Sequence, residues 1–275
     1  MQTIGQKIRS LRTAKRVTQQ TLAEAIGVGA QSVSKWETEV SVPDITLLPM
    51  LARYFGITMD ELFGYRPDAL SEKQRIVRLM ADRGMLRFGS FCLQSGRISP
   101  YYVSSSDTRH ASDHLKMGAF FARAVWEYAP GVSVLAVRSE AELPMAAACG
   151  MILYEKYGVE SEVLTLPQLS ARAECSPCVL LCDTLTSGET LRGALREMRE
   201  DAQAEILGVI VSVDRMERGS HPTLSARSEI ERETGVPMIP LVCFADIVEA
   251  IKQGVISGDA DAMEAYAAQY GEVLL

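Results

Sequence analysis

Basic side chains gather at the start of this sequence, where their chemistry suits the binding of an anion. The first 17 residues contain no acid and five bases: Lys7, Arg9, Arg12, Lys15 and Arg16. The whole 275-residue chain has a net charge of −7, yet residues 1–65 carry seven Lys or Arg against six Asp or Glu. This asymmetry predicts that one end of the chain faces an anion while the acidic remainder serves another purpose.

The six cysteines form no regular framework, which is typical of a reducing compartment. Cys175 and Cys178 have the C-x-x-C spacing of zinc knuckles and redox pairs, but no second ligand pair follows at the usual distance. We therefore predict no metal and no cofactor. The chain begins without an apolar signal segment and has no apolar run near the ~20 residues that span a bilayer. We expect cytoplasmic localisation and no membrane partner.

The length of 275 residues predicts two domains. We place the first domain at residues 1–65, a short polar linker at 66–70 and the second domain at 71–275. Apolar residues of the first domain recur at helical spacing, which predicts five short helices. These contain Ile4, Ile8 and Leu11; Leu22, Ala23 and Ile26, after a cap at Thr18; Ala30 to Glu37; Leu48, Leu51 and Phe55, after Pro43 and Asp44; and Leu62 with Phe63.

The second and third of these helices are joined by a tight turn at residues 27–29, and two helices joined by a short glycine-containing turn form a helix-turn-helix motif. The segment 18–63, TQQTLAEAIGVGAQSVSKWETEVSVPDITLLPMLARYFGITMDELF, closely resembles the lambda Cro and repressor (XRE) family of DNA-binding domains. The resemblance covers the complete module. It implies that the helix from Ala30 lies in the major groove and that Arg12 and Glu37 form an ion pair.

The side chains on this motif suit contact with DNA. Gln31 has an amide whose donor and acceptor match the edge of adenine. Without the surrounding motif, Lys35 would be interpreted as an ordinary exposed helix residue. The start of the second helix can place backbone N–H groups and a side chain on a phosphate. The predicted DNA-binding residues are Thr18, Gln19, Ala30, Gln31, Ser32, Ser34 and Lys35. Because one module reads only a few base pairs, we expect a homodimer that binds two half-sites of double-stranded DNA.

The second domain alternates apolar runs with amphipathic helical stretches, which predicts an α/β domain with a mostly parallel sheet covered on both faces. In such sheets ligands bind at the carboxyl ends of the strands. The predicted strands are Val132–Val137, Glu162–Thr165, Cys178–Cys182, Ile206–Val213 and Met238–Val242. The predicted helices lie near 113–128, 143–157, 188–200 and 224–234.

Three segments of this domain, LRFGSFCLQSGRISPYYVSSS at 86–106, CVLLCDTLTSGETLRGALREM at 178–198 and ILGVIVSVDRMERGS at 206–220, resemble orotate phosphoribosyltransferases. Their order and separations match that family across residues 71–270. The resemblance implies the type I phosphoribosyltransferase fold, whose enzymes pair as homodimers. The expected fold class is therefore an all-α helix-turn-helix domain followed by this α/β domain.

Phosphoribosyl transfer requires certain groups in the active site, and the residues of this chain can be compared with those requirements. The enzyme must neutralise a departing pyrophosphate with magnesium and bases, and bind the ribose hydroxyls with carboxylates. Where the family has two adjacent acids, this chain has Cys182 and Asp183. Glu189 replaces a small hydroxyl residue in the turn for the 5′-phosphate, and a carboxylate ~4 Å from a phosphate costs roughly 4 kcal/mol per charge pair at an effective dielectric near 20.

Other parts of the family's site also differ in this chain. Glu140 and Glu142 stand where the family has a glycine-rich stretch with a lysine, and we expect these acids to repel a pyrophosphate. Gln94 replaces a lysine, and the segment 166–176, LPQLSARAECS, lacks the lysine and histidine of the family's mobile catalytic loop. We therefore predict a catalytically inactive domain with no catalytic residues.

Part of the ligand pocket survives, and it predicts binding of a pyrimidine- or nucleotide-related effector. The resemblance implies that Arg215 holds the carboxylate of a pyrimidine acid, and an ion pair of Arg215 with Asp214 or Glu217 is the alternative. The predicted effector-binding residues are Tyr101, Tyr102, Asp183, Thr186, Ser187, Gly188 and Arg215.

Three functions fit these patterns. The first is a transcription regulator whose inactive second domain pairs the chains and senses a metabolite. The second is an active orotate phosphoribosyltransferase with a tethered regulatory domain. The third is a scaffold that only pairs the DNA-binding arms, which a sealed pocket would favour.

Overall fold

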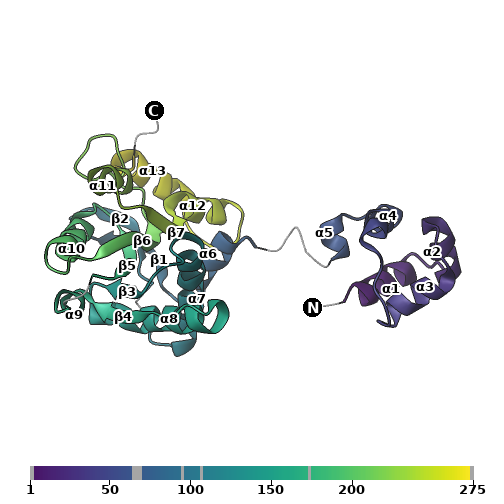
Figure 1. The fold of residues 1–275 in the computed structure, drawn as a ribbon. Helices are drawn as coiled ribbons and strands as arrows, with labels where there is room; N and C mark the ends of the chain where they lie inside the picture. Colours follow the sequence, from purple (N-terminus) through teal and green to yellow (C-terminus); the bar gives the residue numbers. More distant parts are fainter. Residues whose placement is uncertain (1–2, 64–69, 94–95, 106–107, 173–174, 273–275) are drawn as a thin grey trace. The chain divides into compact units, whose positions relative to one another are not determined.

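The computed structural model of the protein describes residues 3–63, 70–93, 96–105, 108–172 and 175–272. Internal contacts divide the chain into two units, Met1–Leu70 and Ser71–Leu275, and each has its own hydrophobic core (Figure 1). Among the described residues, no helix is both long and apolar enough to cross a membrane.

The first unit is all-helical, as predicted. Its helices are α1 (Ile4–Ala14), α2 (Gln19–Ile26), α3 (Ala30–Glu37), the 3-10 turn Ile45–Leu47, α4 (Leu48–Phe55) and α5 (Met59–Leu62). Helix α2 begins at Thr18, whose hydroxyl accepts the N–H of Thr21 at 3.1 Å, and it ends at Gly27 with a left-handed φ of 75°. Leu62 is fully buried, whereas Phe63 lies beyond the end of α5 and is exposed.

The second unit contains a five-stranded parallel sheet in the order β4-β3-β5-β6-β7. The strands are β3 (Val134–Val137), β4 (Glu162–Thr165), β5 (Pro177–Leu185), β6 (Glu205–Asp214) and β7 (Met238–Cys243). All five coincide with predicted strands to within a few residues. Long apolar runs form these strands because both faces of the sheet are covered by helices.

Side chains that alternate along the strands enter two separate cores. In β3, Leu135 and Val137 join the core under α6, α7, α8 and α12, whereas Val134 and Ala136 join the core under α9, α10 and α11. The helices of the first core include α6 (Glu72–Asp82), α7 (Ala111–Tyr128), α8 (Leu143–Tyr157), α12 (Phe244–Lys252) and α13 (Ala260–Tyr270). Those of the second are α9 (Leu166–Ser170), α10 (Glu189–Glu200) and α11 (Ala226–Thr234).

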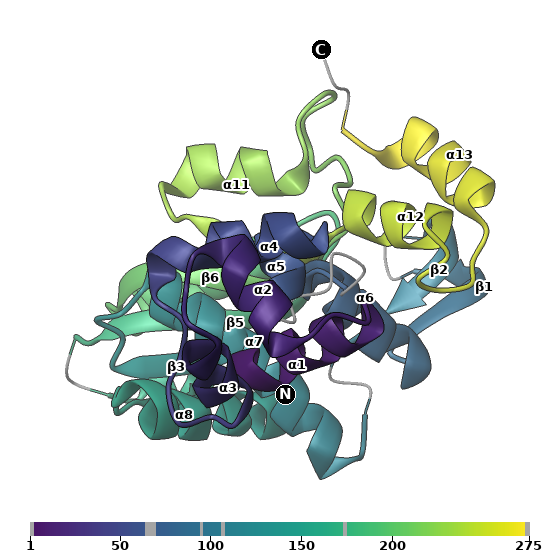
Figure 2. The same cartoon turned by 90° about the vertical axis from the view of Figure 1, so that its right-hand side faces the viewer.

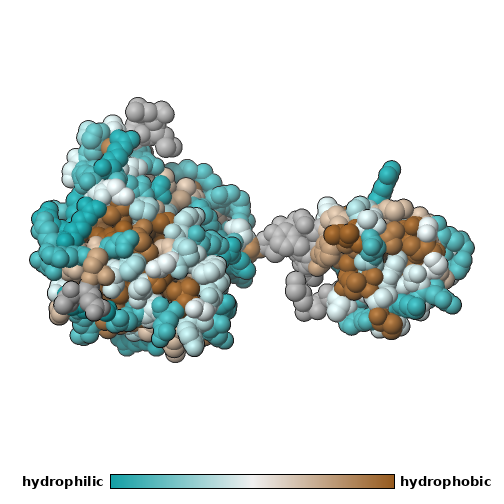
Figure 3. All heavy atoms as spheres, viewed as in Figure 1, coloured by the Kyte–Doolittle hydropathy of each residue, from teal (hydrophilic) through white to brown (hydrophobic). Residues whose placement is uncertain are grey.

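A separate antiparallel hairpin is formed by β1 (Leu86–Cys92) and β2 (Ile98–Val103). Figure 2 shows it beside α12 and the last described helix, α13 (Ala260–Tyr270). The sequence patterns predicted no strands here, although the family resemblance marked this segment. Large apolar side chains remain exposed on both units (Figure 3), and on the helical unit they include Val40, Val42, Ile45 and Phe63.

Candidate functional site

Helix α3 presents one polar face to solvent. Gln31 and Lys35, one helical turn apart, are exposed, while Val33 and Trp36 on the opposite face are buried in the core of the helical unit. Ser32 and Ser34 flank this face and are half-buried. The unit therefore offers the predicted recognition side chains on a rigid helix, a geometry that suits insertion into a DNA groove.

A buried ion pair ties α1 to the end of α3, as the resemblance implied. Arg12 Nε donates to Glu37 Oε1 at 2.6 Å and Arg12 Nη2 donates to Glu37 Oε2 at 3.0 Å. Gln19 Nε2 also donates to Glu37 Oε2, at 2.8 Å. Although burial alone would raise the pKa of Glu37, these hydrogen bonds hold it below its usual value.

The geometry of Gln19 differs from the one we expected. Its side-chain amide is half-buried and donates to Glu37 instead of extending away from the motif. Thr18 is exposed, and its hydroxyl caps α2 through the N–H of Thr21. A phosphate at the start of α2 therefore has backbone N–H groups as its natural partners, since the nearest polar side chains serve the fold.

A cleft of about 270 Å³ lies at the carboxyl ends of the central strands of the α/β unit. Arg138 follows β3, Asp183 and the turn at 186–188 end β5, and Arg215 follows β6. Tyr102 and Val103 of β2 complete the wall. The structure thus brings together five of the seven predicted effector-binding residues: Tyr102, Asp183, Thr186, Gly188 and Arg215.

The two remaining predicted residues do not line the cleft. Tyr101 is fully buried, because alternate residues of β2 point to opposite faces and its ring packs in the core beneath Arg215. Ser187 is half-buried in the turn, and its carbonyl oxygen accepts from Arg192 Nη1 at 3.3 Å. Arg138 does line the cleft, and the sequence did not single it out as a ligand-binding residue.

Asp183 is held by hydroxyl and amide groups at the end of β2. Its Oδ2 accepts from Ser104 Oγ at 2.6 Å, and its Oδ1 accepts from the N–H and the Oγ of Ser105 at 2.5 and 2.6 Å. The preceding Cys182 is buried, and burial raises the pKa of its thiol to about 12. Cys182 therefore stays neutral at physiological pH and does not replace a second carboxylate.

Magnesium serves the transferases that this domain resembles, so the fit of the cleft to such an ion is relevant. Among the described residues, Asp183 is the only acid that lines the cleft, and its oxygens are already bound by Ser104 and Ser105. No group of three or more possible ligand side chains is found in the described part of the chain. The described residues do not supply a magnesium site in this cleft.

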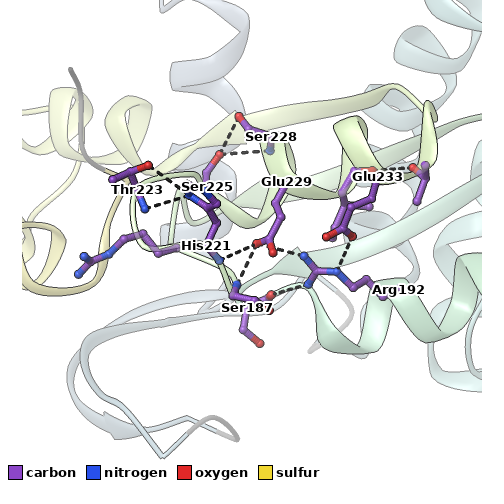
Figure 4. Close-up of polar contacts among 12 residues, drawn as sticks. Ser187, Arg192, His221, Thr223, Ser225, Ser228, Glu229 and Glu233 are labelled. Carbon is purple, nitrogen blue, oxygen red and sulfur yellow. Dashed lines mark hydrogen bonds and ion pairs between the residues drawn. The ribbon is translucent and has the colours of Figure 1, made fainter.

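The turn after β5 is braced by an ionic network in α10 and α11 (Figure 4). Arg192 donates to the Ser187 carbonyl and pairs with Glu229 at 3.1 Å and Glu233 at 2.9 Å. Glu229 in turn accepts the backbone N–H of Ser220 at 2.9 Å. The network fixes the backbone of the turn before any ligand binds, which favours anion binding through preorganised N–H groups.

Gly188 is required by this turn, because its φ is +81° and a Cβ would lie 2.6 Å from Ile230 Cδ1. We expect Gly188→Ala to lower the free energy of unfolding of the α/β unit by about 2–3 kcal/mol, from backbone strain and overpacking. Urea denaturation of the full chain measures this. Gly193→Ala in α10 is the matched control: with no atom within 4 Å of the new Cβ, it should be neutral or slightly stabilising. Equal stabilities of the two variants would contradict the prediction.

The three acids that we expected to repel a pyrophosphate do not line the cleft. Glu142 is buried, accepts from the backbone N–H of Arg138 and Ser139, and pairs with Arg138 Nη2 at 2.9 Å. Glu140 and Glu189 are exposed outside the lining. For Glu142 the expectation was wrong because its carboxylate binds the N–H groups at the start of its own helical turn. Gln94 lies outside the described residues.

Arg215 forms the alternative ion pair, with Glu217. Its Nε donates to Glu217 Oε1 at 2.6 Å, its Nη2 donates to Ser99 Oγ at 2.8 Å, and its guanidinium lies 3.9 Å from the centre of the Tyr101 ring. Both partners of the pair are buried, with 1% of each side chain exposed. Arg97 also pairs with Glu217, at 2.7 Å. Arg215 is therefore a structural part of the cleft wall, with its Nε and Nη2 bound to Glu217 and Ser99.

A helical DNA-binding motif and a parallel α/β unit with its cleft at the strand ends define a helix-turn-helix protein with a phosphoribosyltransferase fold. The helix-turn-helix family model matches residues 8–62. The orotate phosphoribosyltransferase of Thioalkalivibrio sulfidiphilus is 32% identical over 206 residues, which cover 69% of this chain and 93% of that protein. The corresponding enzyme of Pseudomonas fluorescens Pf-5 is 30% identical and covers 71% of this chain and 96% of its own length.

A crystal structure of orotate phosphoribosyltransferase from Francisella tularensis superposes with a TM-score of 0.58 at 21% identity, over 72% of this chain and all of that one. This likeness shows the fold. The chain belongs to the orotate phosphoribosyltransferase family, to which it adds an N-terminal XRE-type helix-turn-helix domain.

Proposed function

We propose that this protein is a transcription regulator that binds two half-sites of operator DNA as a homodimer. In this proposal the phosphoribosyltransferase-like unit pairs the chains and binds a phosphorylated metabolite without catalysing transfer. The observation that carries the proposal is the exposed Gln31–Lys35 face of α3 within a complete helix-turn-helix domain. Phosphate and base contacts from that face are what such a domain uses to read DNA.

Several residue types support loss of catalysis. Cys182 is neutral beside Asp183, so the cleft offers one carboxylate where the family has two. The segment 166–176 contains no lysine or histidine that could stabilise a departing pyrophosphate. The acids at 140, 142 and 189 give no support, because they lie outside the cleft.

A metabolite in the cleft would regulate DNA binding only by preferring one arrangement of the two DNA-binding units over another. The open cleft of about 270 Å³ supports such a ligand and does not favour the third function, a scaffold with a sealed pocket. Its lining includes Arg138, Arg215 and Asp183, and the two arginines are paired with Glu142 and Glu217. An anion would therefore bind mainly through the backbone N–H groups of the turn at 186–188.

Selection of binding sites from random duplexes by the purified full chain, at a defined salt concentration, tests the proposal. We expect two related half-sites whose centres are about one helical turn apart. Light scattering on the same sample measures the mass of the complex. Recovery of no common sequence, or of single half-sites bound by monomers, would contradict the proposal.

An active orotate phosphoribosyltransferase is the second candidate, and the absence of the three glutamates from the cleft wall favours it. We expect no release of pyrophosphate from orotate and phosphoribosyl pyrophosphate, with magnesium present and the protein at high concentration. The Asp183→Asn variant sets the background, because it removes the only carboxylate that lines the described cleft. Turnover by the unchanged chain that Asp183→Asn abolishes would establish the enzyme and refute the inactive domain.

A further inference from the structure

Helix α6 and the start of β1 carry a local excess of positive charge. Residues 66–275 contain 21 Lys or Arg against 29 Asp or Glu, whereas the segment 70–87 contains five Lys or Arg against two acids. The five bases are Lys73, Arg75, Arg78, Arg83 and Arg87. The net charge of this segment is thus opposite to that of the unit as a whole, and an anion is attracted to it.

Two of the five bases are committed to the fold of the α/β unit. Lys73 pairs with Asp246 of α12 at 3.0 Å. Arg83 pairs with Asp113 of α7 at 3.2 Å, and Asp113 is buried. These two bases hold α6 against its neighbouring helices, and an anion from outside would have to compete with their acids.

The other three bases form one exposed surface, the α6 arginine face, which consists of Arg75, Arg78 and Arg87. Arg75 and Arg78 are one helical turn apart, on the side of α6 opposite its buried residues. Arg78 and Arg87 line the same groove of about 350 Å³, between α6, β1 and residues 255–257. The guanidinium carbon of Arg87 lies 4.7 Å from the centre of the Tyr102 ring, a contact that holds this side chain beside the groove.

One acid adjoins the α6 arginine face. Asp82 lines the same groove, and its Oδ2 lies 3.8 Å from Arg78 Nε. Both side chains are more than half exposed, at 66% for Asp82 and 57% for Arg78. Water and salt screen an exposed pair of this kind, so the pair is weak and Arg78 can turn to a phosphate at little cost.

The covalent connection limits how far this face can lie from DNA that the helical unit has bound. Six residues, 64–69, join the described parts of the two units, and a chain of this length spans at most ~25 Å. Helix α6 begins at Glu72, two residues beyond Leu70. Because ~25 Å equals roughly seven base pairs, phosphates beside an occupied half-site lie within reach.

We infer that the α6 arginine face binds backbone phosphates of the DNA that flanks each operator half-site. The inference rests on the proposed function, in which the helical units bind two half-sites. Guanidinium groups suit this partner because they form charge-assisted, bidentate hydrogen bonds with phosphate oxygens. Phosphate contacts carry no sequence information, so this surface adds affinity and leaves base reading to α3.

Operator duplexes of two lengths test the inference on the unchanged full chain. The short duplex ends at the outer edges of the two selected half-sites, and the long duplex adds about ten base pairs, roughly one helical turn, on each side. We expect fluorescence anisotropy to give at least tenfold tighter binding of the long duplex. Equal affinities would overturn the inference and leave the proposed regulator standing, whereas failure to select any operator would refute both.

Paired substitutions test which surface makes the contact. Arg75→Gln combined with Arg78→Gln removes two charges per chain, so we expect at least fivefold weaker binding of the long duplex, with a lower dependence on salt, and less than twofold change for the short duplex. Arg196→Gln combined with Arg232→Gln is the matched control, because it removes two exposed arginines from α10 and α11 on the opposite face of the sheet. The control should leave both affinities unchanged.

Equal losses on the two duplexes, or an equal loss with the control pair, would contradict the role of the α6 arginine face. Hydroxyl-radical footprinting of the unchanged chain on the long duplex gives a second measurement that does not depend on a variant. We expect protection of the flanking backbone beyond each half-site, and protection that ends at the half-sites would overturn the inference.

Discussion

Replacement of Gln31 by alanine is expected to weaken binding to the selected operator by at least about 30-fold. A bidentate contact between a glutamine and adenine contributes about 1–3 kcal/mol of discrimination, and a homodimer loses two such contacts, about 2–6 kcal/mol in total. The side chain is exposed on α3, so its removal leaves the core of the helical unit unchanged. Fluorescence anisotropy of a labelled operator duplex at one fixed salt concentration measures the loss.

Matched variants separate base reading from general attraction to DNA. Gln253→Ala removes an exposed glutamine from the α/β unit and should leave operator affinity unchanged. Lys35→Ala should weaken all duplexes to similar extents and lower the dependence of affinity on salt, as loss of a phosphate contact does. Operator affinity of Gln31→Ala within twofold of the unchanged chain would show that α3 does not read adenine through this residue.

The elements of the α/β unit could be predicted from the sequence because their signals are local. A buried parallel strand is a continuous apolar run, so segments such as 206–213 show their strand character without knowledge of their neighbours. The hairpin of β1 and β2 gave no such signal. Its strand Leu86–Cys92 mixes exposed and buried positions around Gly89, whose φ is +152°, and the register shifts between Phe88 and Phe91.

The partners of charged side chains were harder to predict than the elements that carry them. The strand order brings Arg138, Asp183 and Arg215 to one edge of the sheet, which the topology of such folds predicts. The direction of each side chain depends on nearby hydrogen-bond donors and acceptors. Glu142 turns back to the N–H groups of its own helix start, and Gln19 turns to Glu37. These preferences depend on angstrom-scale geometry that spacing along the chain does not contain.

The charges around the cleft differ from those expected from the sequence. From the residue types alone, we expected three glutamates to face a pyrophosphate. In the folded chain Glu142 pairs with Arg138, and Glu140 and Glu189 lie outside the lining of the cleft. Loss of catalysis, which we propose, therefore depends on missing groups: the acid replaced by Cys182 and the lysine absent from 166–176. Under this proposal, the N–H groups of the turn at 186–188 remain, and a cleft of this kind would be suited to sensing a ligand.

Replacement of Glu37 by alanine is expected to lower the free energy of unfolding of the helical unit by about 3 kcal/mol. The substitution leaves Arg12, with 17% of its side chain exposed, beside an empty site, and removal of one partner of a buried pair costs about 3–5 kcal/mol. Because Arg12 is partly exposed, we expect the loss of stability to lie at the lower end of this range. A Trp126→Phe background leaves Trp36, in the core of the helical unit, as the only tryptophan, so its fluorescence during urea denaturation follows this unit in the full chain. Glu24→Ala, an exposed acid on α2, should change stability by less than about 0.5 kcal/mol, and an equally small change for Glu37→Ala would show that the buried pair does not stabilise the fold.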